Sequence, residues 1–242
     1  MMKTIVIIQA RMGSSRLPGK VLLPLGESVV LDYVVSRCRQ IEGVSDVIVA
    51  TSTLVQDDAI VEWCKDNDVD CCRGSEDDVL SRYIDCAKQY KPDYVIRVTS
   101  DCPFIDYEMA SKIVEKMKEF PADYVKVKGS LPRGLVVEMF AYSALQYIDK
   151  HGREPRHREH VTYYGYEYVD KFKTTTYEVS EALNHPELRI TLDTEEDYEL
   201  CKKVSKHFRG EVLISAQEVV QFLLDNPDVA RINAHIEQKP VV

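Results

Sequence analysis

The chain has 242 residues, 45% of them hydrophobic and 29% charged, and its 31 Lys and Arg against 40 Asp and Glu give a formal charge of -9. This composition is typical of a soluble globular enzyme and argues against a disordered, collagenous or membrane-embedded chain. No apolar run reaches the roughly 18 residues of a membrane-spanning helix. A net acidic chain also disfavours nucleic-acid binding, which needs a basic face. We therefore expect a cytoplasmic protein, with no secretory signal and with neither nucleic-acid nor membrane partners.

The cysteines are odd in number and form no CxxC pair, which fits small buried side chains in a reducing compartment. Only Cys102, beside Asp101, is a candidate nucleophile, and no histidine lies near it in sequence. The seven positions are Cys38, Cys64, Cys71, Cys72, Cys86, Cys102 and Cys201.

In the first half of the chain, strand patterns alternate with helix patterns. The runs TIVIIQA, DVIVATS and DYVIRVTS are rich in Val and Ile, as in strands buried on both faces. Apolar spacings of three and four predict helices over about 31–41, 57–65 and 79–89, and a short extra strand is expected at 69–72. This alternation predicts an α/β protein with βαβ units and a mostly parallel sheet.

After Asp101 the pattern changes. We expect a helix at 107–120, strands in ADYVKVK and GLVVEMFAY, a helix to about 148, and then a basic segment and an aromatic one. ELRITLDT predicts another strand, and the last two helices follow it. No linker is evident, so we predict a single domain over 1–242. Its nucleotide-binding core spans about 1–125 and 187–228, and a small sub-lobe spans about 126–186.

The first strand runs into Ala10-Arg11-Met12-Gly13-Ser14-Ser15-Arg16-Leu17-Pro18-Gly19-Lys20. Small residues let backbone N–H groups turn toward an anion, and two arginines and a lysine supply positive charge at the carboxyl end of a strand. Five residues separate Gly13 from Gly19, and Val21 follows Lys20, so the segment is not a Walker loop. No G-x-G-x-x-G is present either. The segment predicts a triphosphate-binding loop, called the phosphate loop below (residues 10–20).

Two aspartates, Asp101 and Asp193, each follow a predicted strand and precede a helical stretch. Both should reach the sheet edge that carries the phosphate loop, where two carboxylates suit Mg²⁺ together with substrate phosphates. Each aspartate is alternatively a helix N-cap. Asp197 is a less favoured ligand and is better explained as a first-turn helix carboxylate.

A local excess of Arg and His at 153–160 suits an anionic acceptor, such as a carboxylate or a phosphate. A solvated helix end or a dimer contact remains an alternative for this stretch. A zinc site at its histidines is disfavoured by their spacing.

The phosphate loop resembles that of the cytidylyltransferases that activate acidic sugars, the CMP-Kdo and CMP-sialic acid synthetases. Four further motifs resemble the narrower branch named for the spore coat polysaccharide biosynthesis protein SpsF. They are Arg73-Gly74-Ser75-Glu76-Asp77-Asp78, Arg97-Val98-Thr99-Ser100-Asp101, Arg158-Glu159-His160-Val161-Thr162 and Thr191-x-Asp193-Thr194.

The resemblance implies a Rossmann-like nucleotide-diphosphosugar transferase fold and Mg²⁺-dependent transfer of CMP from CTP to an acidic sugar in surface or spore coat polysaccharide synthesis. Arg11, Lys20 and Asp101 are the implied catalytic residues, and Asp101 and Asp193 the implied metal ligands. Nucleotide contacts are expected from Ala10, Arg11, Gly13, Ser14, Arg16, Lys20, Arg73, Ser75, Arg82 and Ser100. Acceptor contacts are expected from Glu138, Arg158, Glu159 and His160. A homodimer is also implied.

Two other functions remain open from the residues alone. One is a glycosyltransferase of similar fold, although no D-x-D motif is evident at a suitable place. The other is a non-catalytic partner that binds nucleotide.

Overall fold

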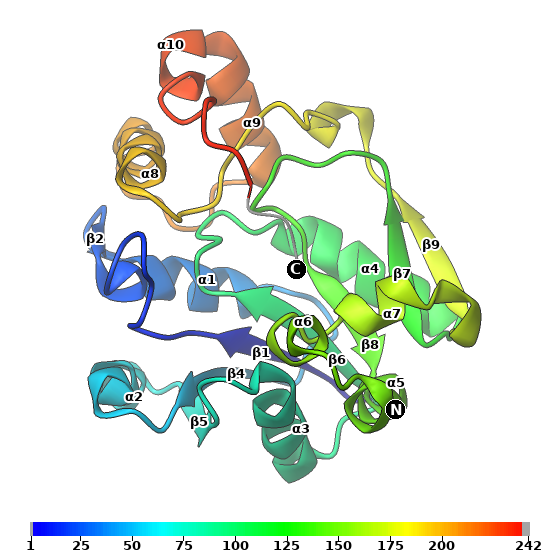
Figure 1. The fold of residues 1–242 in the computed structure, drawn as a ribbon. Helices are drawn as coiled ribbons and strands as arrows, with labels where there is room; N and C mark the ends of the chain where they lie inside the picture. Colours follow the sequence, from blue (N-terminus) through cyan, green and yellow to red (C-terminus); the bar gives the residue numbers. More distant parts are fainter. Residues whose placement is uncertain (1, 239–242) are drawn as a thin grey trace.

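Seven strands form one mixed sheet in the computed structural model, which describes residues 2–238 (Figure 1). Their order is β5-β4-β1-β6-β8-β7-β9, and only β8 runs against its neighbours. The strands are β1 (Thr4–Gln9), β4 (Asp46–Ser52), β5 (Asp70–Gly74), β6 (Tyr94–Thr99), β7 (Tyr124–Lys128), β8 (Glu138–Ala141) and β9 (Thr174–Glu178). A separate hairpin pairs β2 (Pro24–Leu25) with β3 (Ser28–Val29). The predicted mostly parallel α/β sheet is confirmed.

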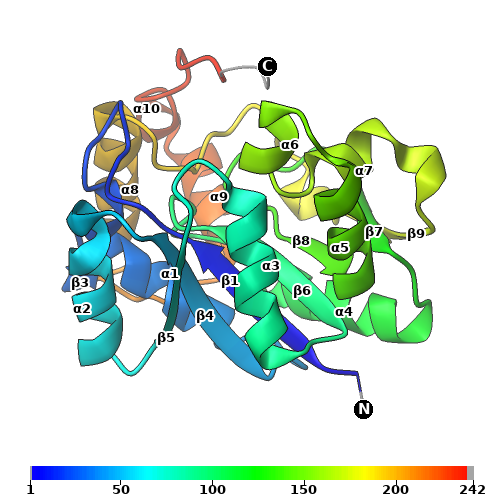
Figure 2. The same ribbon diagram turned by 60° about the horizontal axis from the view of Figure 1, so that its bottom comes forward.

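Helices cover both faces of the sheet (Figure 2). On one face lie α1 (Val30–Cys38), α2 (Asp58–Asp66) and α4 (Tyr107–Glu119), and on the other α3 (Val79–Tyr90) and α5 (Tyr142–His151). In β1, Val6 and Ile8 join the first cluster and Ile5 and Ile7 the second, because successive side chains of a strand point to opposite faces. The expected burial of this strand on both faces is confirmed.

A third hydrophobic cluster lies against α1 and carries the C-terminal helices. These are α8 (Glu195–His207), α9 (Ala216–Asp225) and α10 (Pro227–Ala230), which gather beyond β2 and α1 in Figure 1. Two short helices, α6 (Pro155–Glu159) and α7 (Tyr163–Glu167), follow α5. Single 3₁₀ turns lie at Lys20–Leu22, Val55–Asp57, Val169–Lys171 and Glu181–Leu183.

The structure differs from the sequence-based prediction at ELRITLDT, which is extended but is not a strand of the sheet. Its backbone makes one bridge, between Arg133 and Arg189, and Leu192 N–H donates to the Asp101 carbonyl at 2.7 Å. Buried apolar residues with strand-like spacing pack here without a ladder partner.

The predicted sub-lobe, about 126–186, shares the main sheet with the rest of the domain. The boundary expected near residue 126 falls inside β7, and β7, β8 and β9 continue the main sheet. Among residues 2–238, the helices are too short or too polar to cross a bilayer.

A buried cation joins α1 to the segment that leads into α9. The Arg37 side chain has no exposed surface and donates hydrogen bonds to the carbonyls of Ile105, Val212 and Ile214 at 2.6–2.8 Å. Burial lowers the Arg37 pKa to about 10, so the guanidinium stays charged at neutral pH.

We predict that Arg37→Met lowers the free energy of unfolding by roughly 3 kcal/mol or more. The substitution leaves three backbone carbonyls without the hydrogen bonds that Arg37 donates to them. Urea denaturation measures the change. Lys112→Met, an exposed substitution on α4, should stay within about 0.5 kcal/mol of wild type. Equal stability of the two variants would contradict this account of Arg37.

Candidate active site

A cleft of about 550 Å³ opens at the carboxyl ends of β1 and β6. Ligands of open α/β sheets bind at this edge. The phosphate loop, the turn after β6 and the segment that enters β8 all contribute residues to its lining. Twelve of the predicted site residues line the cleft together: Ala10, Arg11, Ser14, Arg16, Lys20, Arg82, Ser100, Asp101, Glu138, Glu159, His160 and Asp193.

The phosphate loop folds around the backbone of Met12. The Met12 carbonyl accepts from Ser14 N–H at 2.9 Å and Gly19 N–H at 3.0 Å, and Met12 N–H donates to Asp57 Oδ1 at 2.7 Å. Gly19 has φ +71°, a left-handed conformation that favours glycine. Asp57 is fully buried and also accepts from Ser52. It holds the loop against the end of β4, a role that sequence reasoning missed.

The Lys20 ammonium joins the two predicted metal ligands. Its Nζ lies 2.8 Å from Asp101 Oδ2 and 2.8 Å from Asp193 Oδ1. Burial by itself would lower the Lys20 pKa, but the two carboxylates outweigh it and raise that pKa. Burial by itself would raise the Asp101 pKa, but Lys20 outweighs it and lowers that pKa from 3.8 to about 2. Lys20 and Asp101 are therefore both ionised at neutral pH.

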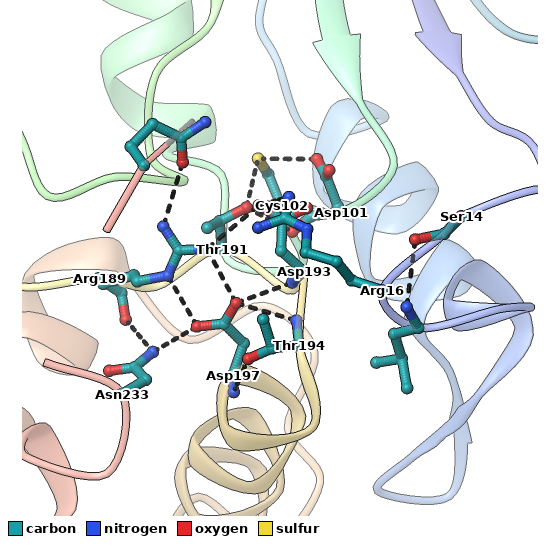
Figure 3. Close-up of polar contacts among 12 residues, drawn as sticks. Ser14, Arg16, Asp101, Cys102, Arg189, Thr191, Asp193, Thr194, Asp197 and Asn233 are labelled. Atoms are coloured by element: carbon teal, nitrogen blue, oxygen red, sulfur yellow. Dashed lines mark hydrogen bonds and ion pairs between the residues drawn. The ribbon is translucent and has the colours of Figure 1, made fainter. Parts of the chain in front are cut away.

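Asp193 is fixed from behind by a second ionic network (Figure 3). Its Oδ2 lies 3.1 Å from both Arg16 and Arg189. Arg189 in turn makes two hydrogen bonds, at 2.8 and 2.9 Å, to the fully buried Asp197, which also accepts from Asn233 Nδ2 at 2.7 Å. The network ties the chain before α8 to a residue near the C-terminus.

Asp197 has a structural role at the start of α8. With Thr194 it forms the capping box of α8, and it accepts from the backbone N–H groups of Asp193 and Thr194. Its hydrogen bonds point away from the cleft into the Arg189 network, which supports its reading as a first-turn helix carboxylate rather than a metal ligand.

The chemistry of Asp101 and Asp193 fits a hard divalent cation. Both are carboxylates that face one point, and the ammonium of Lys20 already balances part of their charge there. No cluster of three or more His, Cys, Asp or Glu side chains suited to a metal occurs within residues 2–238. Two carboxylates match the usual Mg²⁺ arrangement, in which substrate phosphates and waters complete the ligand set.

Of the nucleotide contacts predicted in β5, in α3 and in the turn between them, only Arg82 of α3 lines the cleft. Arg82 is 2% exposed, donates to the Ser75 carbonyl at 2.8 Å, and has a buried Nε without a partner within residues 2–238. Arg73 instead binds the carbonyls of Ser52 and Leu54 and the Asp58 carboxylate. Arg73, Ser75 and Gly13 do not line the cleft in this structure. The guanidinium of Arg73 is bound to the connection between β4 and α2 instead.

Of the acceptor residues predicted in the basic stretch, Glu159 and His160 line the cleft and Arg158 does not. Arg158 makes a bidentate pair with Asp78 at 2.9 and 2.7 Å and binds Asp149 at 2.8 Å, so its charge joins α6 to α3 and α5 and it does not line the cleft. Burial lowers the pKa of His160, which keeps this ring neutral at pH 7.

Glu138 begins β8 and lines the cleft, but it is not free. It pairs with Arg97 of β6, a residue that sequence reasoning did not assign, and accepts from Thr162 Oγ1 at 3.0 Å. Arg97 also donates to Gln9 at 3.2 Å. The strand pairing of Arg97 with Glu138 holds these side chains side by side.

Cys102 is not a nucleophile in this structure. Burial raises its pKa to about 12, and the Asp101 carboxylate adds to the shift, so the thiolate is not formed near neutral pH.

Comparison with known proteins identifies the family. The family model described as cytidylyltransferase matches residues 5–224, which is most of the chain. The chain belongs to the cytidylyltransferase family. It is accordingly a nucleotidyltransferase, and the resemblance seen in its motifs is confirmed. The glycosyltransferase and the non-catalytic partner are thereby disfavoured.

Individual proteins and structures are similar to this chain over most of its length. The spore coat polysaccharide biosynthesis protein SpsF of Bacillus subtilis is 35% identical over 229 residues, or 93% of this chain and 95% of its own. A cytidylyltransferase structure from Leptospira borgpetersenii has a TM-score of 0.90 at 32% identity, covering 99% of this chain and 100% of that one. A CMP:2-keto-3-deoxy-manno-octonic acid synthetase complexed with CTP has a TM-score of 0.67 at 17% identity, covering 85% and 99%, and this similarity shows the shared fold.

We predict that Lys20→Met loses about 3 kcal/mol of unfolding free energy at pH 7, because it leaves Asp101 without its cation. The loss should shrink on acidification toward about pH 4. In wild type the lowered pKa of Asp101 means that the ion pair contributes its full stability above pH 3.8. This contribution is lost as the pH falls toward about 2. In the variant, burial raises that pKa, so Asp101 takes up a proton and the penalty is relieved.

Urea denaturation at several pH values measures both effects, with the exposed Lys65→Met as control. A loss that is equal at all pH values would contradict the proposed role of Lys20.

Proposed function

We propose that this cytidylyltransferase transfers CMP from CTP to a sugar acid and releases pyrophosphate, with Mg²⁺ as the divalent cation. The observation that carries the proposal is the meeting of the phosphate loop with Asp101 and Asp193 through Lys20. The likeness to SpsF supports a product used in spore coat or other surface polysaccharide synthesis. The homodimer and the cytoplasmic location expected from the sequence remain predictions.

In this reaction an acceptor hydroxyl oxygen forms a bond to the α-phosphorus of CTP as the bond to the pyrophosphate oxygen breaks. Catalysis of such transfers is mainly positioning and charge stabilisation. Arg11, Arg16 and Lys20 hold the triphosphate on the phosphate loop. Lys20 then moves from the two aspartates onto a phosphate oxygen.

Asp101 and Asp193 would hold Mg²⁺, which when bound neutralises charge on the phosphates. Arg189, itself paired with Asp197, holds the Asp193 carboxylate in position, and Arg16 of the phosphate loop makes a second ion pair with it. The buried Nε of Arg82, which has no partner in the part of the chain that the structure describes, supplies a donor for the nucleotide from the β5–α3 side.

A thermal-shift panel with CTP, UTP, GTP and ATP, each with and without Mg²⁺, tests the nucleotide. We predict that CTP is the one nucleotide of the four that stabilises the protein, by roughly 2–3 kcal/mol at about 100 times its dissociation constant. Mg²⁺ should enhance this stabilisation. In Asp101→Asn the enhancement by Mg²⁺ should disappear, whereas the exposed Asp66→Asn should behave as wild type. Stabilisation by another nucleotide, or none, would refute the CTP assignment.

A further inference from the structure

The fold brings together cysteines that are scattered in the sequence. All seven are free thiols, and four of them belong to β5 or to the helices beside it (Figure 2). Among the described strands, β5 is an edge strand that pairs only with β4. It carries Cys71 and Cys72, while Cys64 lies in α2 and Cys86 in α3. These four thiols do not line the cleft, so the proposed transfer reaction leaves them without a role.

A tight turn sets Cys71 against Cys64. The helix α2 ends at Asp66, and Val69 N–H donates to the Cys64 carbonyl at 2.9 Å, so the chain doubles back on the last turn of the helix. Asp68 has φ +52°, a left-handed conformation that allows this reversal. Val69 and Cys71 are two residues apart, and both pack in the hydrophobic cluster that contains Cys64. This is expected of alternate residues in an extended segment.

The two thiols share a hydrogen bond. Donation by the Cys64 thiol lowers the pKa of Cys71 against the effect of burial, and the positive charge of Arg73 adds to the lowering. The same hydrogen bond, together with burial, raises the pKa of Cys64. Cys64 is fully buried, whereas Cys71 is half-buried. Cys71 is therefore the thiol of this pair that ionises more readily and that reaches solvent.

A second pair, Cys72 with Cys86, lies on the other face of β5 in the second hydrophobic cluster. The Cys86 thiol lowers the pKa of Cys72, but the negative charge of Asp70 works against this shift. Cys72 is only 7% exposed, and Cys86 is fully buried. The second pair therefore has less access to solvent and a less favourable local charge than the first, and it serves as a comparison within the same molecule.

We propose that Cys64 and Cys71 form a site of reversible oxidation, at which a peroxide converts the two thiols into a disulfide that joins β5 to α2. The Cys71 sulfur attacks hydrogen peroxide, an S–O bond forms as the O–O bond breaks, and a sulfenic acid and one water result. The Cys64 sulfur then attacks the Cys71 sulfur, the S–O bond breaks, and a second water leaves. Two thiols and one peroxide thus give one disulfide and two waters, with two electrons passing from sulfur to oxygen.

The site lies on elements that support the phosphate loop. Asp57, which holds that loop, directly precedes α2, and Asp58 of α2 lies 2.7 Å from Arg73 of β5. A disulfide between Cys64 and Cys71 joins two elements that are already in contact, so we expect the oxidised protein to stay folded. The inference goes beyond the proposed function and does not depend on it.

The test treats the reduced full chain with a small excess of hydrogen peroxide, blocks the remaining thiols with N-ethylmaleimide and maps the cysteines by mass spectrometry of proteolytic peptides. Wild type should lose two of its seven thiols and yield a link between Cys64 and Cys71, while Cys72 and Cys86 stay reduced. Dithiothreitol should restore all seven thiols. Cys64→Ser should form no link and should leave Cys71 as a sulfenic acid that dimedone traps. The matched neighbour variant Cys72→Ser should form the same link as wild type.

The mapping of wild type decides the question by itself, even where a variant fails to fold. Folded wild type in which Cys64 and Cys71 both stay reduced would overturn the proposal. So would a link of Cys71 to Cys72 or to a second copy of the chain, or oxidation of Cys72 and Cys86 in preference to the first pair. Oxidation of Cys71 that dithiothreitol does not reverse would also contradict it.

Discussion

The ion pairs of Lys20 with Asp101 and Asp193 bring together three segments that are far apart in sequence. The phosphate loop, the turn after β6 and the start of α8 meet at this one ammonium. Burial works against all of these charges, and their mutual attraction outweighs it, as the lowered Asp101 pKa and the raised Lys20 pKa show. Because the site is held by opposite charges, a triphosphate can replace the carboxylates as the partner of Lys20, and a divalent cation can replace Lys20 as the partner of the carboxylates. The total charge of the site then stays nearly balanced.

The rest of the fold supports this contact from behind. Asp57 pins the phosphate loop to the end of β4, and Arg189 with Asp197 pins Asp193 to α8. Asn233 adds hydrogen bonds to the Arg189 carbonyl and to Asp197, so the C-terminal segment takes part in positioning a residue of the cleft. Charged side chains that never face the cleft therefore decide where the cleft residues stand.

The parts of the site that follow strand ends were predictable from the sequence, because parallel strands deliver their carboxyl ends to one edge of a sheet. That rule places the phosphate loop and Asp101 together. Asp193 reaches them differently, because the segment before it forms no ladder and is joined to the turn after β6 by the hydrogen bond from Leu192 N–H to the Asp101 carbonyl. The roles of Arg73 and Arg158 were not predictable, since their partners are a carboxylate fifteen residues away and one eighty residues away.

The most direct test of the role of Lys20 is a crystal structure of the protein with Mn²⁺ and a non-hydrolysable CTP analogue, with the metal located by its anomalous signal. We predict Mn²⁺ bound by Asp101 and Asp193, the triphosphate on residues 10–20, and the Lys20 ammonium moved from bridging the carboxylates onto a phosphate oxygen. Mn²⁺ bound away from both aspartates, or a triphosphate lying off the loop while Lys20 still bridges them, would contradict the account.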